Sequence, residues 1–230
     1  MQTKDTCWTG SSVSKAKARK QEQKTRTAKE KRAKAVVDSL KLETNLLSQF
    51  PSLGVYSKNG CNLKVKFCQA SELSAAIRAW AYELCEQNMR SLYEDVWGWK
   101  PAEKQSELKH PDARYLLVHD ADGSTVAYVH FRFEVEDATP VLYVYEVQLA
   151  PAVQRKGLGA FLMTLLKLVA KKNQLEAIML TVLDANTAAL KMYTKLGYKP
   201  HHTSPSQADS IGHLEEPTGY EILSLQLGHQ

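Results

Sequence analysis

Apolar and polar residues alternate along several short segments of this chain. Leu63, Val65 and Phe67 alternate with Lys64 and Lys66, which predicts a strand with one buried face. The same alternation, or a short apolar run, predicts five further strands, over residues 114–119, 125–135, 141–149, 177–182 and 220–225.

Segments with helical periodicity lie between these strands. Leu73, Ile77 and Leu84 recur at intervals of three to four residues or their multiples, which predicts an amphipathic helix ending near residue 92. Similar patterns predict helices over 157–172 and 187–196. This order predicts an α+β fold in a single domain, with a mixed and mostly antiparallel central sheet flanked by helices.

The composition supports one folded body outside a membrane. The chain has 230 residues, 43% of them hydrophobic, enough for one good-sized core. Its apolar runs are shorter than the roughly 18 residues of a membrane helix, and its first thirty residues are charged, so we expect no membrane span and no signal peptide. It begins Met-Gln, without the second-position glycine that myristoylation needs. The four cysteines lack metal-binding spacing, which favours a reduced compartment and no metal.

Positive charge is concentrated near the N-terminus. Residues 14–34 contain ten lysines and arginines against Glu22 and Glu30, a net +8, and since the whole chain carries +5 the remainder carries −3. A basic, helix-forming arm of this kind is a nuclear import signal, a nucleic-acid-binding segment or simply a solvated helix. We divide the chain into a basic arm, disordered or helical, a helix with a linker, the main domain and a tail, over residues 1–34, 35–59, 60–226 and 227–230.

One loop joins the strand that ends at Leu149 to the next helix. In Gln154-Arg-Lys-Gly157-Leu-Gly159 the backbone N–H groups converge at a helix N-terminus, which is an anion site. The glycines allow close approach of a phosphate, and the two cations add charge. A pyrophosphate fits, although neither a Walker loop nor a complete dinucleotide fingerprint is present. Taken alone, the turn is equally consistent with an ordinary helix start.

Two motifs in the right order carry a family resemblance. Gln-x-x-Gly-x-Gly after an apolar strand resembles the acetyl-CoA loop of the GNAT superfamily of N-acetyltransferases, and 186–198, with Asn186 and Tyr193, resembles its second half. Five further segments are similar to one branch, the N-alpha-acetyltransferases of the NatD type: 93–100, 130–136, 142–149, 179–182 and 220–224. The likeness covers about residues 60–225.

The resemblance implies transfer of acetyl from acetyl-CoA to the N-terminal serine of Ser-Gly-Arg-Gly tails, those of histone H4 and histone two-A, without a metal. It implies that the cofactor is bound by Val147, Gln148, Leu149, Gln154, Arg155, Lys156, Gly157, Leu158, Gly159, Ala160 and Asn186. It implies a peptide site formed by Tyr93, Trp97, Glu134, Glu136, Tyr145, Thr181 and Tyr220. Catalysis would fall to Glu146, Tyr145 and Tyr193.

The chemistry of these residues suits the roles but leaves alternatives. A protein α-amino group, with a pKa of about 7.7 to 8.0, needs only a modest base. By strand parity Glu146 shares a face with Leu142 and Val144, so we expect it to be buried and to act as that base; otherwise it lies in water at a splayed strand end. Tyr193 would donate a proton to the departing thiolate, or only pack its helix.

The peptide residues likewise admit two interpretations. Tyr145 and Tyr93 would hold a small N-terminal residue, or fill the core. Glu134 and Glu136 alternate onto one strand face and would receive an arginine, or face solvent.

Several expectations follow for the whole protein. We expect a monomer in the nucleus and cytoplasm, whose partners are histone tails, with nucleic acid or an import receptor at the basic arm. Two other functions stay open. One is an N-acetyltransferase for other protein N-termini, lysines or a small amine, and the other is a catalytically inactive chromatin-binding module.

Overall fold

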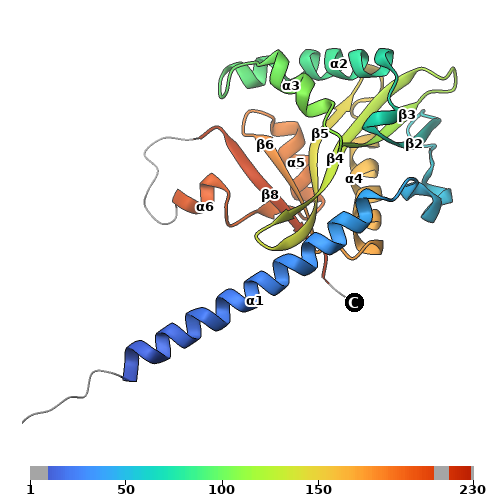
Figure 1. Ribbon diagram of the computed structural model, residues 1–230. Helices are drawn as coiled ribbons and strands as arrows, with labels where there is room; N and C mark the ends of the chain where they lie inside the picture. The colour runs from blue at the N-terminus through green and yellow to red at the C-terminus, as the bar shows by residue number, and fades with distance from the viewer. Residues whose placement is uncertain (1–9, 210–217, 229–230) are drawn as a thin grey trace, which may run out of the picture.

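A computed structural model describes residues 10–209 and 218–228. Its centre is a sheet of eight strands in the order β1-β2-β3-β4-β5-β6-β8-β7 (Figure 1). Every neighbouring pair is antiparallel except β5 and β6, which are parallel. The predicted α+β fold with a mixed, mostly antiparallel sheet is confirmed. The strands are β1 (Val55–Tyr56), β2 (Leu63–Gln69), β3 (Arg114–His119), β4 (Thr125–Glu136), β5 (Thr139–Leu149), β6 (Ala177–Leu183), β7 (Lys199–Pro200) and β8 (Tyr220–Gln226).

Helices cover both faces of this sheet. On one face Leu162 and Leu166 of a central helix pack in the largest buried cluster, together with Val129 of β4. On the other, Leu84 and Leu108 from two further helices pack with buried tyrosines of β3 and β4. The helices are α1 (Gly10–Lys41), α2 (Ala75–Glu94), α3 (Pro101–Leu108), α4 (Leu158–Lys172), α5 (Thr187–Lys195) and α6 (Pro205–Asp209), and 3-10 turns cover Leu46–Gln49, Pro51–Leu53, Ala70–Glu72 and Pro151–Val153.

The sequence pattern located the longer elements to within a few residues but missed α3. This helix begins with Pro101 at its first position, where the missing N–H has no cost. Only Lys104 and Leu108 of its eight residues are buried. Such a short helix with a single large apolar residue has no periodicity to detect, yet it carries a central residue of the site described below.

The N-terminal helix is long, and its contacts with the body lie in its C-terminal part, from Lys29 onward. Ala33, Val37 and Leu40 are buried, and this part lies across β4 and β5, while the preceding turns project away from the domain (Figure 1). None of the helices in the described ranges is long and apolar enough to cross a membrane.

Candidate active site

Strands β5 and β6 separate partway along their length. They pair only between Val141–Val144 and Ala177–Leu180, after which β5 continues beside β4 and β6 beside β8. Within the described part of the chain, no strand therefore pairs with the β6-facing edge of β5 beyond Val144. Backbone groups on that edge are available to a ligand. A cavity of about 440 Å³ opens at this point.

The cavity brings together most of the residues that the sequence placed in the catalytic and peptide sites. The predicted residues that line it are Tyr93, Trp97, Tyr145, Glu146, Val147, Gln148, Thr181, Asn186, Tyr193 and Tyr220. Lys104, Glu107 and Tyr143 line it as well and were not predicted. The Tyr143 hydroxyl lies 2.7 Å from the Thr181 hydroxyl across the diverging strands.

A β-bulge in β5 corrects the reasoning by strand parity. His130 of β4 pairs with Glu146 and the next residue, Phe131, pairs with Val144, so Tyr145 is an extra residue on β5. An extra residue shifts the alternation of side chains by one. Glu146 therefore lies on the α2 and α3 face, whereas Val144 packs in the α4 core. The expected burial of Glu146 is correct, at 5% exposure, but the face is opposite to the one predicted.

Both carboxylate oxygens of Glu146 have buried partners. Lys104 Nζ of α3 donates to Glu146 Oε1 at 2.6 Å, and Gln148 Nε2 donates to Glu146 Oε2 at 2.6 Å. Asn88 Nδ2 of α2 in turn donates to Gln148 Oε1 at 2.9 Å. Because Lys104 of α3 and Gln148 of β5 hold its two oxygens, and Asn88 of α2 in turn fixes Gln148, the Glu146 carboxylate has one fixed orientation toward the cavity.

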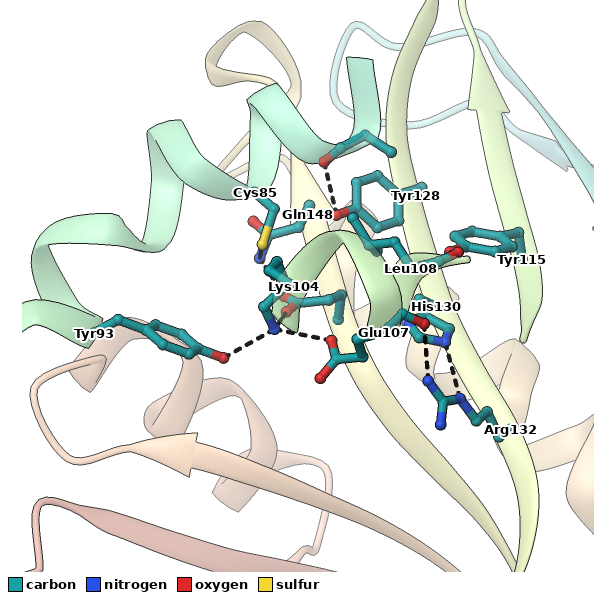
Figure 2. Close-up of polar contacts among 12 residues, drawn as sticks. Cys85, Tyr93, Lys104, Glu107, Leu108, Tyr115, Tyr128, His130, Arg132 and Gln148 are labelled. Carbon is teal, nitrogen blue, oxygen red and sulfur yellow. Dashed lines mark hydrogen bonds and ion pairs between the residues drawn. The ribbon is translucent and has the colours of Figure 1, made fainter. Parts of the chain in front are cut away.

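Lys104 is the central cation of this network. It also donates to Glu107 Oε1 at 2.9 Å and to the Tyr93 hydroxyl at 3.3 Å, and Figure 2 shows it pointing toward both. Burial alone would lower the pKa of Lys104, but the Glu146 and Glu107 carboxylates outweigh burial and raise it. Burial raises the pKa of Glu107, which Lys104 partly offsets. Lys104 is thus a permanent cation and cannot itself act as the base.

Tyr145, the bulged residue, connects the cavity to β4. Its hydroxyl donates to Glu134 Oε1 at 2.6 Å, and the Arg132 guanidinium lies 4.1 Å from its ring centroid. Burial and the Glu134 contact raise the pKa of Tyr145, which keeps the phenol protonated at neutral pH. Neither Glu134 nor Glu136 is among the residues that line the cavity, and Glu134 is linked to the site through the Tyr145 hydroxyl.

His130 lies buried between two tyrosine rings. Its ring centroid is 5.2 Å from that of Tyr115 and 4.9 Å from that of Tyr145, in stacked orientations. Arg132 Nε, which can only donate, lies 3.4 Å from His130 Nε2 (Figure 2). Burial, and secondarily the Arg132 charge, hold the pKa of His130 well below its ordinary value, so the imidazole is neutral in the folded protein.

This neutral histidine predicts a pH dependence of stability. The pKa of His130 is depressed in the folded protein and about 6.5 in the unfolded chain. At a pH between these two values only the unfolded chain binds the proton. The free energy of unfolding therefore falls as the pH drops below about 6.5, by up to about 1.4 kcal/mol per pH unit. We expect the stability difference between pH 7 and pH 5, from urea denaturation, to be larger in the wild type than in His130→Phe. Equal differences in the two proteins would contradict a neutral buried His130.

Tyr193 enters the cavity from α5. It is 7% exposed, and its ring packs against Tyr198 at 5.6 Å between centroids. Burial, with the Glu146 charge second, raises the pKa of Tyr193. The phenol therefore stays protonated and can donate a hydrogen bond to a thiolate, although complete transfer of its proton to a thiol with a pKa near 8.5 would be uphill. Asn186 caps the same helix, its Oδ1 accepting from the Ala189 N–H at 3.2 Å.

The predicted cofactor loop lies beyond the open strand edge and is braced from behind. Gln154 Nε2 donates to the Leu149 carbonyl at 2.9 Å, and Asn59 Nδ2 and the Tyr56 hydroxyl both donate to the Lys156 carbonyl. Gly157, at φ +83°, is the N-cap residue of α4. A Cβ there would lie 3.0 Å from the Tyr56 hydroxyl, so it would crowd that group in addition to straining the backbone.

The start of α4 fits the phosphates of the implied cofactor. Its first turn has no acidic residue and no side-chain cap, so its first N–H groups have no partner within the helix. Arg155 is exposed beside them. With a pyrophosphate bound here, the rest of the cofactor would run along the open edge of β5. The sequence predicts the same position, with Val147–Leu149 beside the cofactor.

Replacing Gly157 tests this loop against a matched glycine. Gly60 has φ +74° and no atom within 4 Å of an added Cβ, so we expect Gly60→Ala to cost about 1 kcal/mol through its backbone alone. Gly157→Ala should cost more, because of the Tyr56 hydroxyl, and should also weaken acetyl-CoA binding. Thermal unfolding and calorimetric titration with acetyl-CoA measure the two effects. Unchanged acetyl-CoA affinity in Gly157→Ala would contradict the proposed position of the cofactor.

One group outside the cavity has the composition of a metal site. Ligand atoms of Asp137, His201 and His202 lie within 4.8 Å of one another. His202 Nε2 is paired with Asp137 at 3.0 Å, and His201 Nδ1 lies 2.7 Å from the Thr203 hydroxyl. Since each group is exposed at least in part and already has a protein partner, ordinary surface contacts account for this cluster.

Known proteins resemble both the sequence and the fold. The model of the acetyltransferase (GNAT) family matches residues 78–198. Mycothiol acetyltransferase of Tsukamurella paurometabola is 34% identical over 91 residues, 40% of this chain and 31% of that protein. The chain thus spans about a third of the length of the curated relatives it matches.

Two solved structures share the fold at low sequence identity. A GNAT-family acetyltransferase from Listeria monocytogenes has a TM-score of 0.53 at 12% identity, covering 75% of this chain and 99% of that one. The protein yncA from Salmonella typhimurium, solved with acetyl-CoA, has a TM-score of 0.50 at 17% identity, covering 74% and 96%. Because the family match spans more than half of the chain, this protein belongs to the GNAT family of acetyltransferases.

Proposed function

We propose that this protein is an N-alpha-acetyltransferase that modifies the N-terminal serine of Ser-Gly-Arg-Gly tails, those of histone H4 and histone two-A, in the nucleus and cytoplasm. The observation that carries the proposal is the lining of the cavity. A buried carboxylate, Glu146, lines the cavity together with several aromatic side chains. These side chains are Tyr93, Trp97, Tyr143, Tyr145 and Tyr220. A carboxylate among aromatic rings suits a chain end that carries an amine and a small side chain.

The residues divide the chemistry between proton transfer and orientation. Acetyl-CoA, when bound, supplies the acetyl group as a thioester. Glu146 accepts the proton that the α-amine loses, directly or through a water molecule; two of its roughly four lone-pair sites are used by Lys104 and Gln148, which leaves others free. Tyr193 donates a hydrogen bond on the thiolate side. A lysine amine, with a pKa near 10.4, would ask more of the same base.

Two carboxylates on β4 would select the third residue of the substrate. Glu134 and Glu136 are two residues apart on one strand, so their side chains share a face about 7 Å apart. Burial raises the pKa of Glu136, and the neighbouring Glu134 charge adds to it. An arginine would relieve this repulsion through charge-assisted hydrogen bonds, each worth about 1.5 to 3 kcal/mol.

Acetylation assays with matched peptides test the proposal. Purified protein and acetyl-CoA are incubated with Ser-Gly-Arg-Gly-Lys-Gly-Gly, with the same peptide blocked at its N-terminus, and with a small amine, and mass spectrometry locates the acetyl group. We expect product only at the free N-terminus. Product from the blocked peptide would instead identify a lysine acetyltransferase, and product only from the small amine a small-molecule enzyme. No product from any substrate, with acetyl-CoA still bound, would favour an inactive binding module.

A double-mutant cycle then tests the arginine contact. Glu134→Gln should raise KM for the Ser-Gly-Arg-Gly peptide by about tenfold or more, the equivalent of one charge-assisted hydrogen bond. With a peptide that carries alanine in place of the arginine, the same variant should change KM little, because no guanidinium is present. Equal effects on both peptides would assign Glu134 only to holding Tyr145.

A further inference from the structure

Four lysines form a stripe along one face of α1. Lys17, Lys20, Lys24 and Lys31 follow one another at intervals of three, four and seven residues, which places them on one face of a helix. All four are exposed. At 1.5 Å per residue the stripe is about 21 Å long. We call these residues the lysine stripe.

The lysine stripe faces away from the body. Ala33 is buried against the domain, and Lys24 lies nine residues before it, about two and a half turns, which is the opposite side of the helix. Glu22 precedes Ala33 by about three whole turns, and Glu30 by a little less than one. The two carboxylates of the arm therefore lie nearer the body side, and the outward face has positive charge alone.

The lysines near the body have partners, whereas the stripe does not. Lys29 contacts Thr139 and Glu176, Lys34 pairs with Asp38, and Lys41 pairs with Asp112. Over the described ranges, none of the four stripe lysines forms an ion pair. Their charge stabilises nothing within this part of the chain and is available to a partner.

The composition of the arm identifies the chemistry of that partner. Between residues 15 and 32 the only apolar residues are alanines. A helix that binds a membrane surface needs a large apolar face, and protein interfaces depend on buried apolar or aromatic anchors. Neither is present here. The remaining possibility is a partner with a row of negative charges, and the phosphates of a nucleic acid backbone form such a row.

We propose that the lysine stripe binds the phosphate backbone of duplex nucleic acid. The helix keeps the cations in register, so that they follow successive phosphates without contacting bases. Lys29 ties the same helix to Thr139, the first residue of β5, and β5 carries Glu146. Nucleic acid on the stripe would therefore be held at a fixed place relative to the cavity, as suits a substrate chain end that emerges from a nucleoprotein particle.

Salt dependence gives the sharpest test. Binding of a fluorescent 20-base-pair DNA duplex, and of an RNA duplex of the same sequence, is measured by anisotropy between 50 and 250 mM salt. Four phosphate contacts predict a slope of log K against log salt of about −3.6 on DNA. Replacing Lys17, Lys24 and Lys31 by Gln should reduce the magnitude of that slope by about 2.7. Comparison of the two duplexes shows which nucleic acid is preferred.

A matched variant provides the control. Replacing Arg19, Arg26 and Arg32 by Gln removes the same charge from other faces of the helix and should leave most of the slope. Circular dichroism checks that both variants keep the helix, and peptide acetylation should be unchanged in both, which separates this proposal from that of the catalytic function. An equal reduction of the salt slope in the two variants would contradict the proposed role of the lysine stripe. So would binding to an import receptor or to anionic vesicles without binding to either duplex.

Discussion

Glu146→Gln is expected to lower kcat for the Ser-Gly-Arg-Gly peptide by about 100- to 10,000-fold, the usual contribution of a general base. Glutamine keeps the shape of the side chain and a carbonyl acceptor for Lys104, but it cannot take a proton from the amine. The affinity for acetyl-CoA should stay the same, because the phosphate loop is untouched. Steady-state kinetics with acetyl-CoA titration measures both quantities.

A second variant separates lost chemistry from lost structure. Glu146→Gln removes one charge of a buried ion pair, whose Nζ–Oε1 distance is 2.6 Å, and removing one partner of such a pair is strongly destabilising. Combining it with Lys104→Met and Glu107→Gln removes the other charges of the network and should restore much of the stability without restoring kcat. If Glu146→Gln retained kcat within tenfold of the wild type, the base would have to be another group.

Lys104→Met alone is expected to lower the free energy of unfolding by about 3 to 5 kcal/mol. The change leaves the carboxylates of Glu146 and Glu107 buried without their shared cation. The loss of stability in Lys104→Met should also depend on pH. Lys104 lowers the pKa of Glu107, so this pKa rises further in the variant. Protonation of Glu107 then stabilises the folded variant at low pH, and this stabilisation is lost as the pH rises through the pKa of Glu107. The deficit should therefore be smaller at pH 5 than at pH 8.

Lys100→Met is the matched control for this prediction. Lys100, the N-cap residue of α3, pairs with Glu103 of that helix at 3.4 Å on the surface, and exposed pairs contribute about 0 to 1 kcal/mol. Urea denaturation of both variants at both pH values gives the comparison. A cost below about 1 kcal/mol for Lys104→Met, similar to that of Lys100→Met, would show that the buried network does not hold the site together.

Local pattern was sufficient wherever one residue's neighbours in sequence are also its neighbours in space. Alternation located β3 to the residue, and helical period located α5 to within one. The loop from Gln154 to Gly159 could be read as an anion site because a glycine with positive φ and a helix start are both local features. Tyr145, Glu146 and Tyr193, chosen from motifs, do line one cavity.

Only the tertiary structure decided how the carboxylate is held. The alternation of residues along β5 does not reveal a bulge in the sequence. The extra residue, Tyr145, is defined only by how β5 pairs with β4. Lys104 is 42 residues from Glu146 in the chain, and its helix has too few apolar residues to be recognised alone. His130 similarly needed its two stacking partners to be seen. The sequence by itself therefore determined the fold, the family and the glycine turn between β5 and α4, which depend on local backbone preferences. The charge network that positions Glu146 depends on contacts between distant segments, and those exist only once the sheet and both helices have packed.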